Sequence, residues 1–132
     1  MIHLLEKQRQ GDLPIDICGI GSNHDNCHDI ARYHNIPFHY LPISNETKQA
    51  QEDNIDALCK ECDIDFIILA RYMQILSSNF CANYKSKIIN IHHSFLPGFK
   101  GANPYKQAYI KGVKVIGATS HFVTEDLDEG PI

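Results

Sequence analysis

Short apolar runs that alternate with polar, helix-forming segments restrict the fold of this 132-residue chain more than any other feature of its sequence. The runs predicted to form strands cover residues 14–21, 36–41, 65–70, 88–97 and 113–123. Strands separated by helices at this spacing form βαβ units, whose right-handed crossovers produce a mostly parallel sheet. We therefore predict an α/β, Rossmann-like fold with helices on both faces of that sheet. The run at 65–70 is apolar throughout, which is typical of a strand buried on both faces.

Capping and stop residues set the boundaries of the predicted helices. These helices cover residues 2–8, 25–34, 44–62, 77–84 and 103–111. Gly11 is the expected stop of the first helix, and Ser44 or Asn45 is the expected cap of the longest one. Ser77 and Asn103 are predicted to cap the last two helices. No internal repeat or domain linker interrupts this pattern, so we predict one domain over residues 1–132.

Two polar segments follow apolar runs and are candidates for a binding site. The run at 88–97 carries Asn90 and His92 to the point where the backbone turns. The run at 113–123 leads into an acidic loop that contains Asp128 and closes with Gly-Pro. In a parallel α/β sheet, ligands bind beyond the carboxyl ends of the strands. We therefore expect both segments to face one pocket.

Composition and charge argue against several classes of function. The formal charge of −4 is unfavourable for extended contact with nucleic-acid phosphates, because such contact requires an excess of Lys and Arg. No apolar run approaches the ~20 residues of a membrane-spanning helix. The five cysteines are odd in number and scattered, which indicates reduced thiols rather than a disulfide framework. These features predict a cytoplasmic protein without a nucleic-acid or membrane partner.

Asn90, His92 and Asp128 form a chemically useful set if one pocket brings them together. A carboxylate orients a neighbouring imidazole, and an amide N–H and an imidazolium both donate to an oxyanion. This set suits attack on a carbonyl carbon. No serine or cysteine with a base of its own is evident, so water or an external amine is the expected nucleophile. On the residues alone, His92 as a core histidine with satisfied hydrogen bonds stays an alternative.

Four longer segments carry a family resemblance. They are Asn-Ile-His-His-Ser-Phe-Leu-Pro at 90–97, Gly-Ala-Asn-Pro-Tyr at 101–105, Gly-Val-Lys-Val-Ile-Gly-Ala-Thr at 112–119, and the segment 121–132. Together they resemble the formyltransferase-fold family, whose members use 10-formyltetrahydrofolate. The segments 22–24, 36–39 and 69–77, and the paired histidines at 92 and 93, are similar to the branch that hydrolyses this folate. The resemblance thus implies a hydrolase of one-carbon metabolism that releases formate and tetrahydrofolate.

The resemblance also implies roles for individual residues. Asn90, His92 and Asp128 are the implied catalytic set, with water ordered by Asp128 attacking the formyl carbon. The loop 71–76 and the backbone of 124–128 are implied to hold the pterin. The implied substrate-binding residues are Arg71, Met73, Gln74, Ile75, Leu76, His93, His121 and Thr124. The resemblance implies that the folate is the substrate, with no separate cofactor, and that the protein is a homo-oligomer. No metal is expected, because Cys59 and Cys62 form the single C-x-x-C of the sequence and lack a second ligand pair.

His93 and His121 each keep two interpretations. His93 either tunes the site of the attacking water or satisfies backbone groups in the turn. His121 lies on the run 113–123, where a structural hydrogen bond is favoured over catalysis.

The two ends of the chain depart from the family pattern. A doubly wound sheet normally begins with a central strand, whereas this chain begins with a helix. It ends at Gly130-Pro131-Ile132, where a further strand would start. We therefore expect a partial catalytic domain that lacks an N-terminal ACT domain, the first strand, and the C-terminal strand and helix.

Two other functions compete with hydrolysis. A transferase of the same fold would deliver the formyl group to an amine such as glycinamide ribonucleotide or a charged initiator tRNA. It would need a phosphate-binding loop or a basic tRNA-binding surface, and neither is evident in the sequence. The remaining alternative is an inactive fragment that binds folate.

Overall fold

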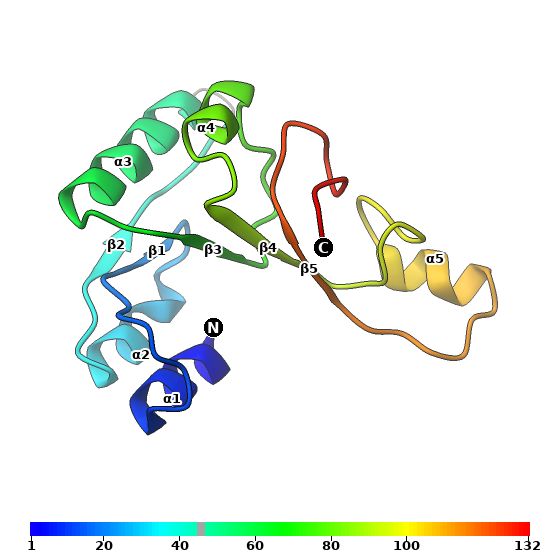
Figure 1. Cartoon of the computed structure of the whole chain (residues 1–132), viewed down its shortest axis with the longest axis horizontal. Coiled ribbons are helices and arrows are strands. Elements are labelled where there is room, and N and C mark those ends of the chain that lie inside the picture. The colour runs from blue at the N-terminus through cyan, green and yellow to red at the C-terminus, as the bar shows by residue number, and fades with distance from the viewer. Residues whose placement is uncertain (45–46) are drawn as a thin grey trace. The chain divides into compact units, whose positions relative to one another are not determined.

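The computed structural model describes residues 1–44 and 47–132 (Figure 1). The chain divides into two compact units, Met1–Ile64 and Asp65–Ile132, and each is described by itself. The single partial domain over residues 1–132 stays a prediction. Asn45, one of the two expected helix caps, lies outside the described residues.

The first unit contains three α-helices, a short 3₁₀ helix and two strands within its described residues. In chain order these are α1 (Ile2–Gln10), β1 (Ile20–Ser22), η1 (Asp25–Cys27), α2 (His28–Tyr33), β2 (Phe38–Tyr40) and α3 (Lys48–Glu61). Gly11 ends α1 in the left-handed conformation at φ 78°, as predicted. Thr47 occupies the N-cap position of α3. Ser44 does not cap the helix, and its backbone N–H donates a hydrogen bond to the Thr47 hydroxyl.

The core of the first unit forms where α1, β1 and α2 meet. Its buried centre is Leu5, Ile20 and Ala31, and partly buried apolar side chains pack around it: Ile17, Ile30, Ile36 and Phe38. β1 and β2 pair in parallel, with Ile20 opposite Phe38. The predicted strand at 14–21 is wrong over most of its length, because only residues from Ile20 onward join the ladder. Residues 14–19 lie outside the ladder and form no regular secondary structure.

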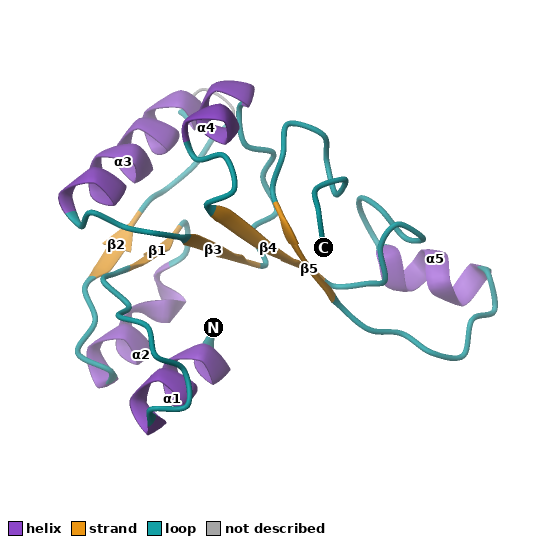
Figure 2. Ribbon diagram, viewed as in Figure 1, coloured by secondary structure: helices purple, strands orange, loops and turns teal. Residues whose placement is uncertain are grey.

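The second unit holds a three-stranded sheet and two helices (Figure 2). The elements are β3 (Ile67–Ala70), α4 (Ser78–Asn83), β4 (Ile88–His92), α5 (Pro104–Ile110) and β5 (Thr119–Phe122). β3 and β4 are parallel, with Leu69 opposite Asn90. Together with the parallel pair β1 and β2, this confirms the α/β class and the mostly parallel pairing.

β5 differs from the prediction in both length and direction. It runs antiparallel to β4, with Asn90 opposite His121 and His92 opposite Thr119. Residues 113–118 form a loop instead of the first half of the strand, and Val115 and Ile116 are exposed. An apolar run therefore forms a strand only where a neighbouring strand supplies hydrogen bonds. Here the neighbouring strand is β4, which ends at His92, opposite Thr119.

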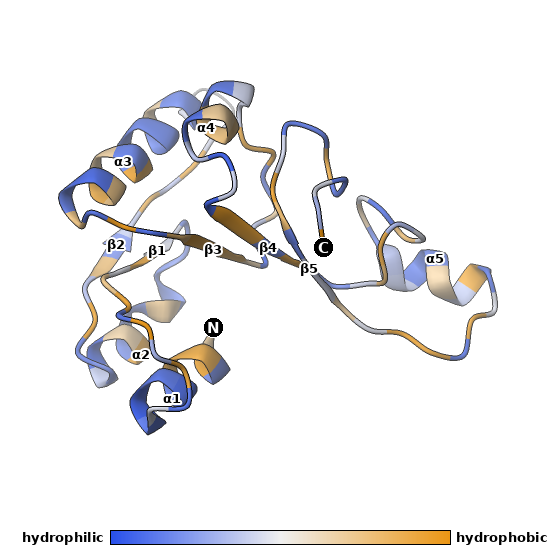
Figure 3. Ribbon diagram, viewed as in Figure 1, coloured by the Kyte–Doolittle hydropathy of each residue, from blue (hydrophilic) through white to orange (hydrophobic). Residues whose placement is uncertain are grey.

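β3 is not buried on both faces, contrary to the prediction. Figure 3 shows β3 and β4 as hydrophobic segments, yet exposure alternates along β3 and Ile68 is 41% exposed. Among the described residues, no strand pairs with the edge of β3 opposite β4. Among the described residues, β3 therefore has one exposed face and one edge without a paired strand.

The turn after β4 is held by one side chain of β5. The Thr119 hydroxyl donates to the Ser94 carbonyl at 2.8 Å and accepts from the Leu96 N–H at 3.0 Å. Thr119 and Ser94 are both buried. A single hydroxyl thus satisfies two backbone groups that the turn leaves without a ladder partner.

Two further predictions concern the chain as a whole. All five cysteines are free thiols. Within the described ranges, no helix combines the length and the apolar character needed to cross a lipid bilayer.

Asn103 precedes α5 as predicted, but it adopts φ 57° and its side chain makes no capping hydrogen bond.

Replacing Ser77 by Ala should destabilise the chain by about 1 kcal/mol, because the Ser77 hydroxyl accepts the Phe80 N–H at the start of α4. Urea unfolding followed by circular dichroism measures the change. Ser78→Ala is the matched control, since Ser78 lies inside α4 and is exposed. Equal stability of the two variants would contradict the capping role.

Replacing Thr119 by Val keeps the shape of the side chain and removes both hydrogen bonds of its hydroxyl. Leaving the buried Ser94 carbonyl and Leu96 N–H without a partner should cost about 1–3 kcal/mol of unfolding free energy. Ser120→Ala, at the exposed neighbouring position on β5, should change stability by less than about 0.5 kcal/mol. A Thr119→Val chain as stable as the parent would show that the turn is held by other contacts.

Candidate active site

A cavity of about 260 Å³ opens in the second unit, between the segments that follow β3, β4 and β5. Its walls come from the loop after Ala70, from β4 and the two residues Gly101 and Ala102, and from β5 with the loop behind it. Every predicted site residue lines this cavity: Arg71, Met73, Gln74, Ile75, Leu76, Asn90, His92, His93, His121, Thr124 and Asp128. The expectation that the two polar segments face one pocket is therefore confirmed.

β4 places Asn90 and His92 on the same wall because side chains two residues apart on a strand share a face. Ile88, two residues earlier on that face, is buried. Ile91 points to the other face and is exposed. The period of the strand thus delivers an amide and an imidazole to the cavity.

Asp128 reaches this wall by a route that differs from the predicted one. Because β5 is antiparallel to β4, its carboxyl end lies beside the start of β4, with Phe122 opposite Ile89. The loop after β5 then turns back, and its base is closed by the Phe122 N–H donating to the Pro131 carbonyl at 2.9 Å. The predicted neighbourhood of Asp128 is right, but its predicted cause, a shared carboxyl end of parallel strands, is wrong.

Asp128 is buried and joins two loops. Its Oδ2 accepts the Gly101 N–H at 2.9 Å, while its Oδ1 lies 3.6 Å from His92 Nδ1 and 3.8 Å from His121 Nε2. Asp128 adopts φ 56°, a left-handed conformation that Asp tolerates better than most residues. One carboxylate oxygen is therefore held by the backbone, and the other faces two imidazole rings.

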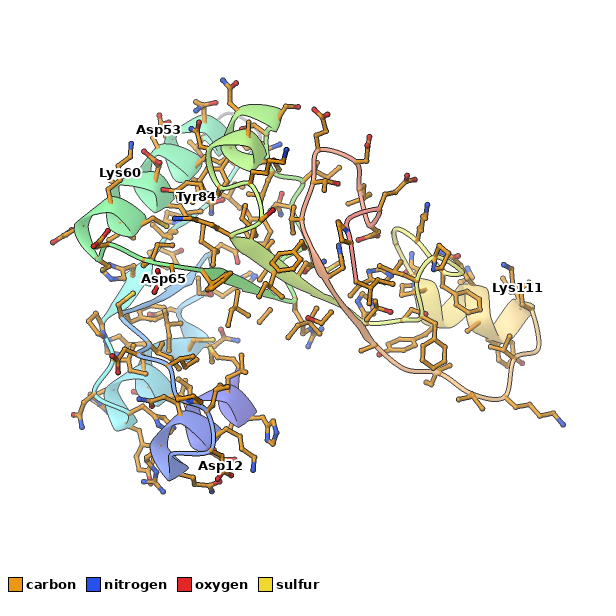
Figure 4. The ribbon with its side chains drawn as sticks, in the orientation of Figure 1. Asp12, Asp53, Lys60, Asp65, Tyr84 and Lys111 are labelled. Atoms are coloured by element: carbon orange, nitrogen blue, oxygen red, sulfur yellow. The ribbon has the colours of Figure 1, made fainter. Side chains whose placement is uncertain are left out.

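His92 is oriented by a backbone carbonyl. Its Nε2 donates to the Phe99 carbonyl at 2.8 Å, so the proton of the neutral ring lies on Nε2 and Nδ1 faces Asp128. Phe99 is buried, and the ammonium of Lys111 lies 5.0 Å from the centre of its ring (Lys111 is labelled in Figure 4). The orientation of His92 thus depends on the packing of Phe99.

His121 is fixed at both ring nitrogens. Its Nδ1 donates to the Phe122 carbonyl at 3.0 Å, and its Nε2 accepts the Asn90 side-chain N–H at 3.3 Å. The ring is buried. These contacts agree with the structural hydrogen bond that the sequence favoured for His121.

The remaining predicted residues form the outer part of the cavity. Met73 and Ile75 are exposed apolar side chains on the loop after β3, and Arg71 begins that loop with φ 55°. Thr124 donates its hydroxyl to the Asp126 carbonyl at 3.2 Å. This part of the cavity offers apolar surface and backbone groups, which suits a flat heteroaromatic ring.

His93 is the third imidazole of the cavity and is partly buried. Its ring centre lies 5.4 Å from that of His92 and 5.3 Å from that of Tyr105, with an edge-on arrangement against Tyr105. No described residue forms a hydrogen bond with its ring nitrogens. The interpretation that His93 satisfies backbone groups of the turn is therefore not seen.

Several partners of the site were missed by sequence reasoning. The Phe99 carbonyl and the Gly101 N–H are backbone groups, and no side-chain pattern reports where a backbone group points. Gly101 opens one of the family-like segments, which was the only signal available. Within the described part of the chain, no group of three or more His, Cys, Asp or Glu side chains is arranged to hold a metal ion.

Comparison with known proteins identifies the family to which this chain is similar. The family model described as formyl transferase matches residues 1–132. A formyltetrahydrofolate deformylase of Bacillus subtilis is 50% identical over 129 residues, which cover 98% of this chain and 43% of that protein. The Arabidopsis thaliana protein named formyltetrahydrofolate deformylase 1, mitochondrial, is 52% identical over 138 residues, which cover 100% of this chain and 41% of that protein. The chain thus spans less than half the length of these relatives.

Solved structures share the fold. The crystal structure of a formyltetrahydrofolate deformylase from Burkholderia mallei superposes with a TM-score of 0.91 at 51% identity, covering 99% of this chain and 47% of that one. A phosphoribosylglycinamide formyltransferase from Anaplasma phagocytophilum gives a TM-score of 0.84 at 34% identity, covering 98% and 62%. With a family model that matches from the first residue to the last, the chain belongs to the formyl transferase family.

Proposed function

We propose that this chain carries the catalytic centre of a hydrolase that converts 10-formyltetrahydrofolate and water into formate and tetrahydrofolate. The observation that carries the proposal is the cluster of Asn90, His92 and Asp128 on one wall of the cavity. The relatives named formyltetrahydrofolate deformylase, at about half identity, support the choice of substrate.

In the proposed reaction, Asp128 orders the water that attacks the formyl carbon. Its Oδ2 is engaged by Gly101, so Oδ1 is the oxygen that accepts a hydrogen bond from the water. Attack forms a carbon–oxygen bond and a tetrahedral oxyanion. Collapse of this intermediate breaks the bond between carbon and N10, and the amine leaves after it gains a proton.

Asn90 and protonated His92 stabilise the oxyanion in this proposal. An amide NH₂ has two donors, and His121 uses one of them, so Asn90 retains a second N–H for the substrate. His92 keeps its Nε2 proton on Phe99, so a second proton on Nδ1 is the one that faces the reacting atoms and Asp128. Preoriented donors of this kind typically contribute 10²–10³-fold each in rate.

The loop 71–76 and the backbone of 124–128 hold the pterin in this proposal. Met73 and Ile75 present apolar surface to a flat ring, and backbone N–H and C=O groups of the acidic loop match the polar edge of a pterin. We further propose that the protein needs no metal or separate cofactor, assembles as a homo-oligomer and works in the cytoplasm.

Formyl transfer to an amine is the second candidate. The fold shared with the phosphoribosylglycinamide formyltransferase supports it. Both reactions pass through the same oxyanion, and they differ in whether water or an amine attacks. Formate released in the absence of any amine acceptor identifies the hydrolase. Folate binding without formate release would indicate the inactive fragment.

Asp128→Asn should lower formate release from 10-formyltetrahydrofolate by at least about 100-fold, because the amide cannot order the water as a carboxylate does. Asn retains an oxygen for the Gly101 N–H, so the fold should survive. Asp65→Asn, exposed in the same unit and outside the lining of the cavity, is the matched control and should keep parent activity. Parent-like turnover by Asp128→Asn, or no formate from the folded parent chain, would refute the proposed function.

A further inference from the structure

The rings of His92 and His121, two of the imidazoles that line the cavity, are held in place by hydrogen bonds. His92 donates from Nε2 to the Phe99 carbonyl, and its Nδ1 faces the Asp128 carboxylate. His121 donates from Nδ1 to the Phe122 carbonyl and accepts from Asn90 at Nε2. Both rings are buried, so neither can turn without breaking these bonds.

His93 is held differently from its two neighbours. Its ring contacts the ring of His92 and the edge of the Tyr105 ring. The side chain is partly buried and lines the same cavity. A neutral imidazole has one donor and one acceptor nitrogen, and on His93 no described residue occupies either. His93 can therefore accept a proton at one nitrogen and release one from the other.

The proposed hydrolysis needs such a group. The attacking water must lose a proton, and the N10 amine must gain one before it leaves. His92 stabilises the oxyanion only while it keeps its second proton, so it cannot also donate that proton to N10. Asp128 accepts the Gly101 N–H at Oδ2, and its Oδ1 lies 3.6 Å and 3.8 Å from two ring nitrogens, so the role assigned to it above is to order the water.

We infer that His93 is the proton-transfer residue of this site, an inference that rests on the proposed function. It takes a proton from the water as the carbon–oxygen bond forms, and it becomes an imidazolium. It gives a proton to N10 as the carbon–nitrogen bond breaks, and it returns to the neutral ring. The step balances without an oxidant or reductant, because one water is consumed and the formyl group leaves as formic acid, which ionises to formate.

The decisive variant is His93→Phe, which keeps an aromatic ring against His92 and Tyr105 and removes both nitrogens. We expect kcat and kcat/KM for 10-formyltetrahydrofolate to fall together by about 10²–10⁴-fold. Tyr105→Leu is the control for packing, since it removes the ring contact and leaves the imidazole, and it should lose far less activity.

Chemical rescue separates proton transfer from structure. His93→Ala leaves space beside His92, and added imidazole should restore part of the lost formate release in that variant. It should not restore Asp128→Asn. A structural role for His93 predicts no rescue.

A second measurement does not depend on turnover. Diethyl pyrocarbonate acylates accessible, unbonded imidazole nitrogens, so peptide mapping of the treated parent chain should show His93 modified faster than His92 and His121. Slower modification of His93, or an unchanged kcat in His93→Phe, would overturn this inference and leave the hydrolase standing. A parent chain that releases no formate would instead remove the proposed function and this inference with it.

Discussion

The hydrogen bond from the Gly101 N–H to Asp128 Oδ2 is the contact on which the geometry of the cavity depends. It joins the turn after β4 to the loop after β5, two segments that share no strand ladder at this point. Because Asp128 is buried, this bond also compensates part of the cost of removing a carboxylate from water. The ion pair between Lys100 and Glu129, at 2.7 Å, joins the same two loops, and the two contacts together hold Asp128 within 4 Å of His92.

Backbone carbonyls decide how the imidazoles of this cavity are used. The Phe99 and Phe122 carbonyls each accept a proton from one ring, which fixes the tautomers of His92 and His121 when these rings are neutral. Their remaining nitrogens then face Asp128 Oδ1 and the Asn90 amide. The packing of Phe99 beneath Lys111, outside the lining of the cavity, therefore influences the orientation of His92 through the Phe99 carbonyl.

The direction of β5 explains why an acidic loop, rather than a strand end, supplies the carboxylate. An antiparallel β5 carries the chain away from the end of β4, and the loop must return over the sheet to bring Asp128 back. The return is closed by the bond between Phe122 and Pro131. A loop of this kind can be longer or shorter without disturbing the sheet, which makes it a suitable place for residues that contact a ligand.

The sequence by itself determined the features that depend on local chemistry. Gly11 stops α1 because only a residue free of a Cβ adopts φ 78° at little cost, and Ser77 caps α4 because its hydroxyl reaches a backbone N–H three residues on. The two-residue period of β4 placed Asn90 and His92 together. The family-like segments then identified Asp128 as their companion.

Only the tertiary structure decided the features that depend on a distant partner. The apolar runs at 14–21 and 113–123 are strands only where β2 and β4 supply hydrogen bonds, so their lengths and the direction of β5 were not encoded locally. Ile68 is exposed although its strand is apolar. Whether a strand face is buried depends on the elements that pack against it, and the composition of the strand does not encode them. The proton positions on His92 and His121 likewise follow from carbonyls that a sequence pattern cannot place, since every residue carries the same carbonyl and the fold alone determines where it points.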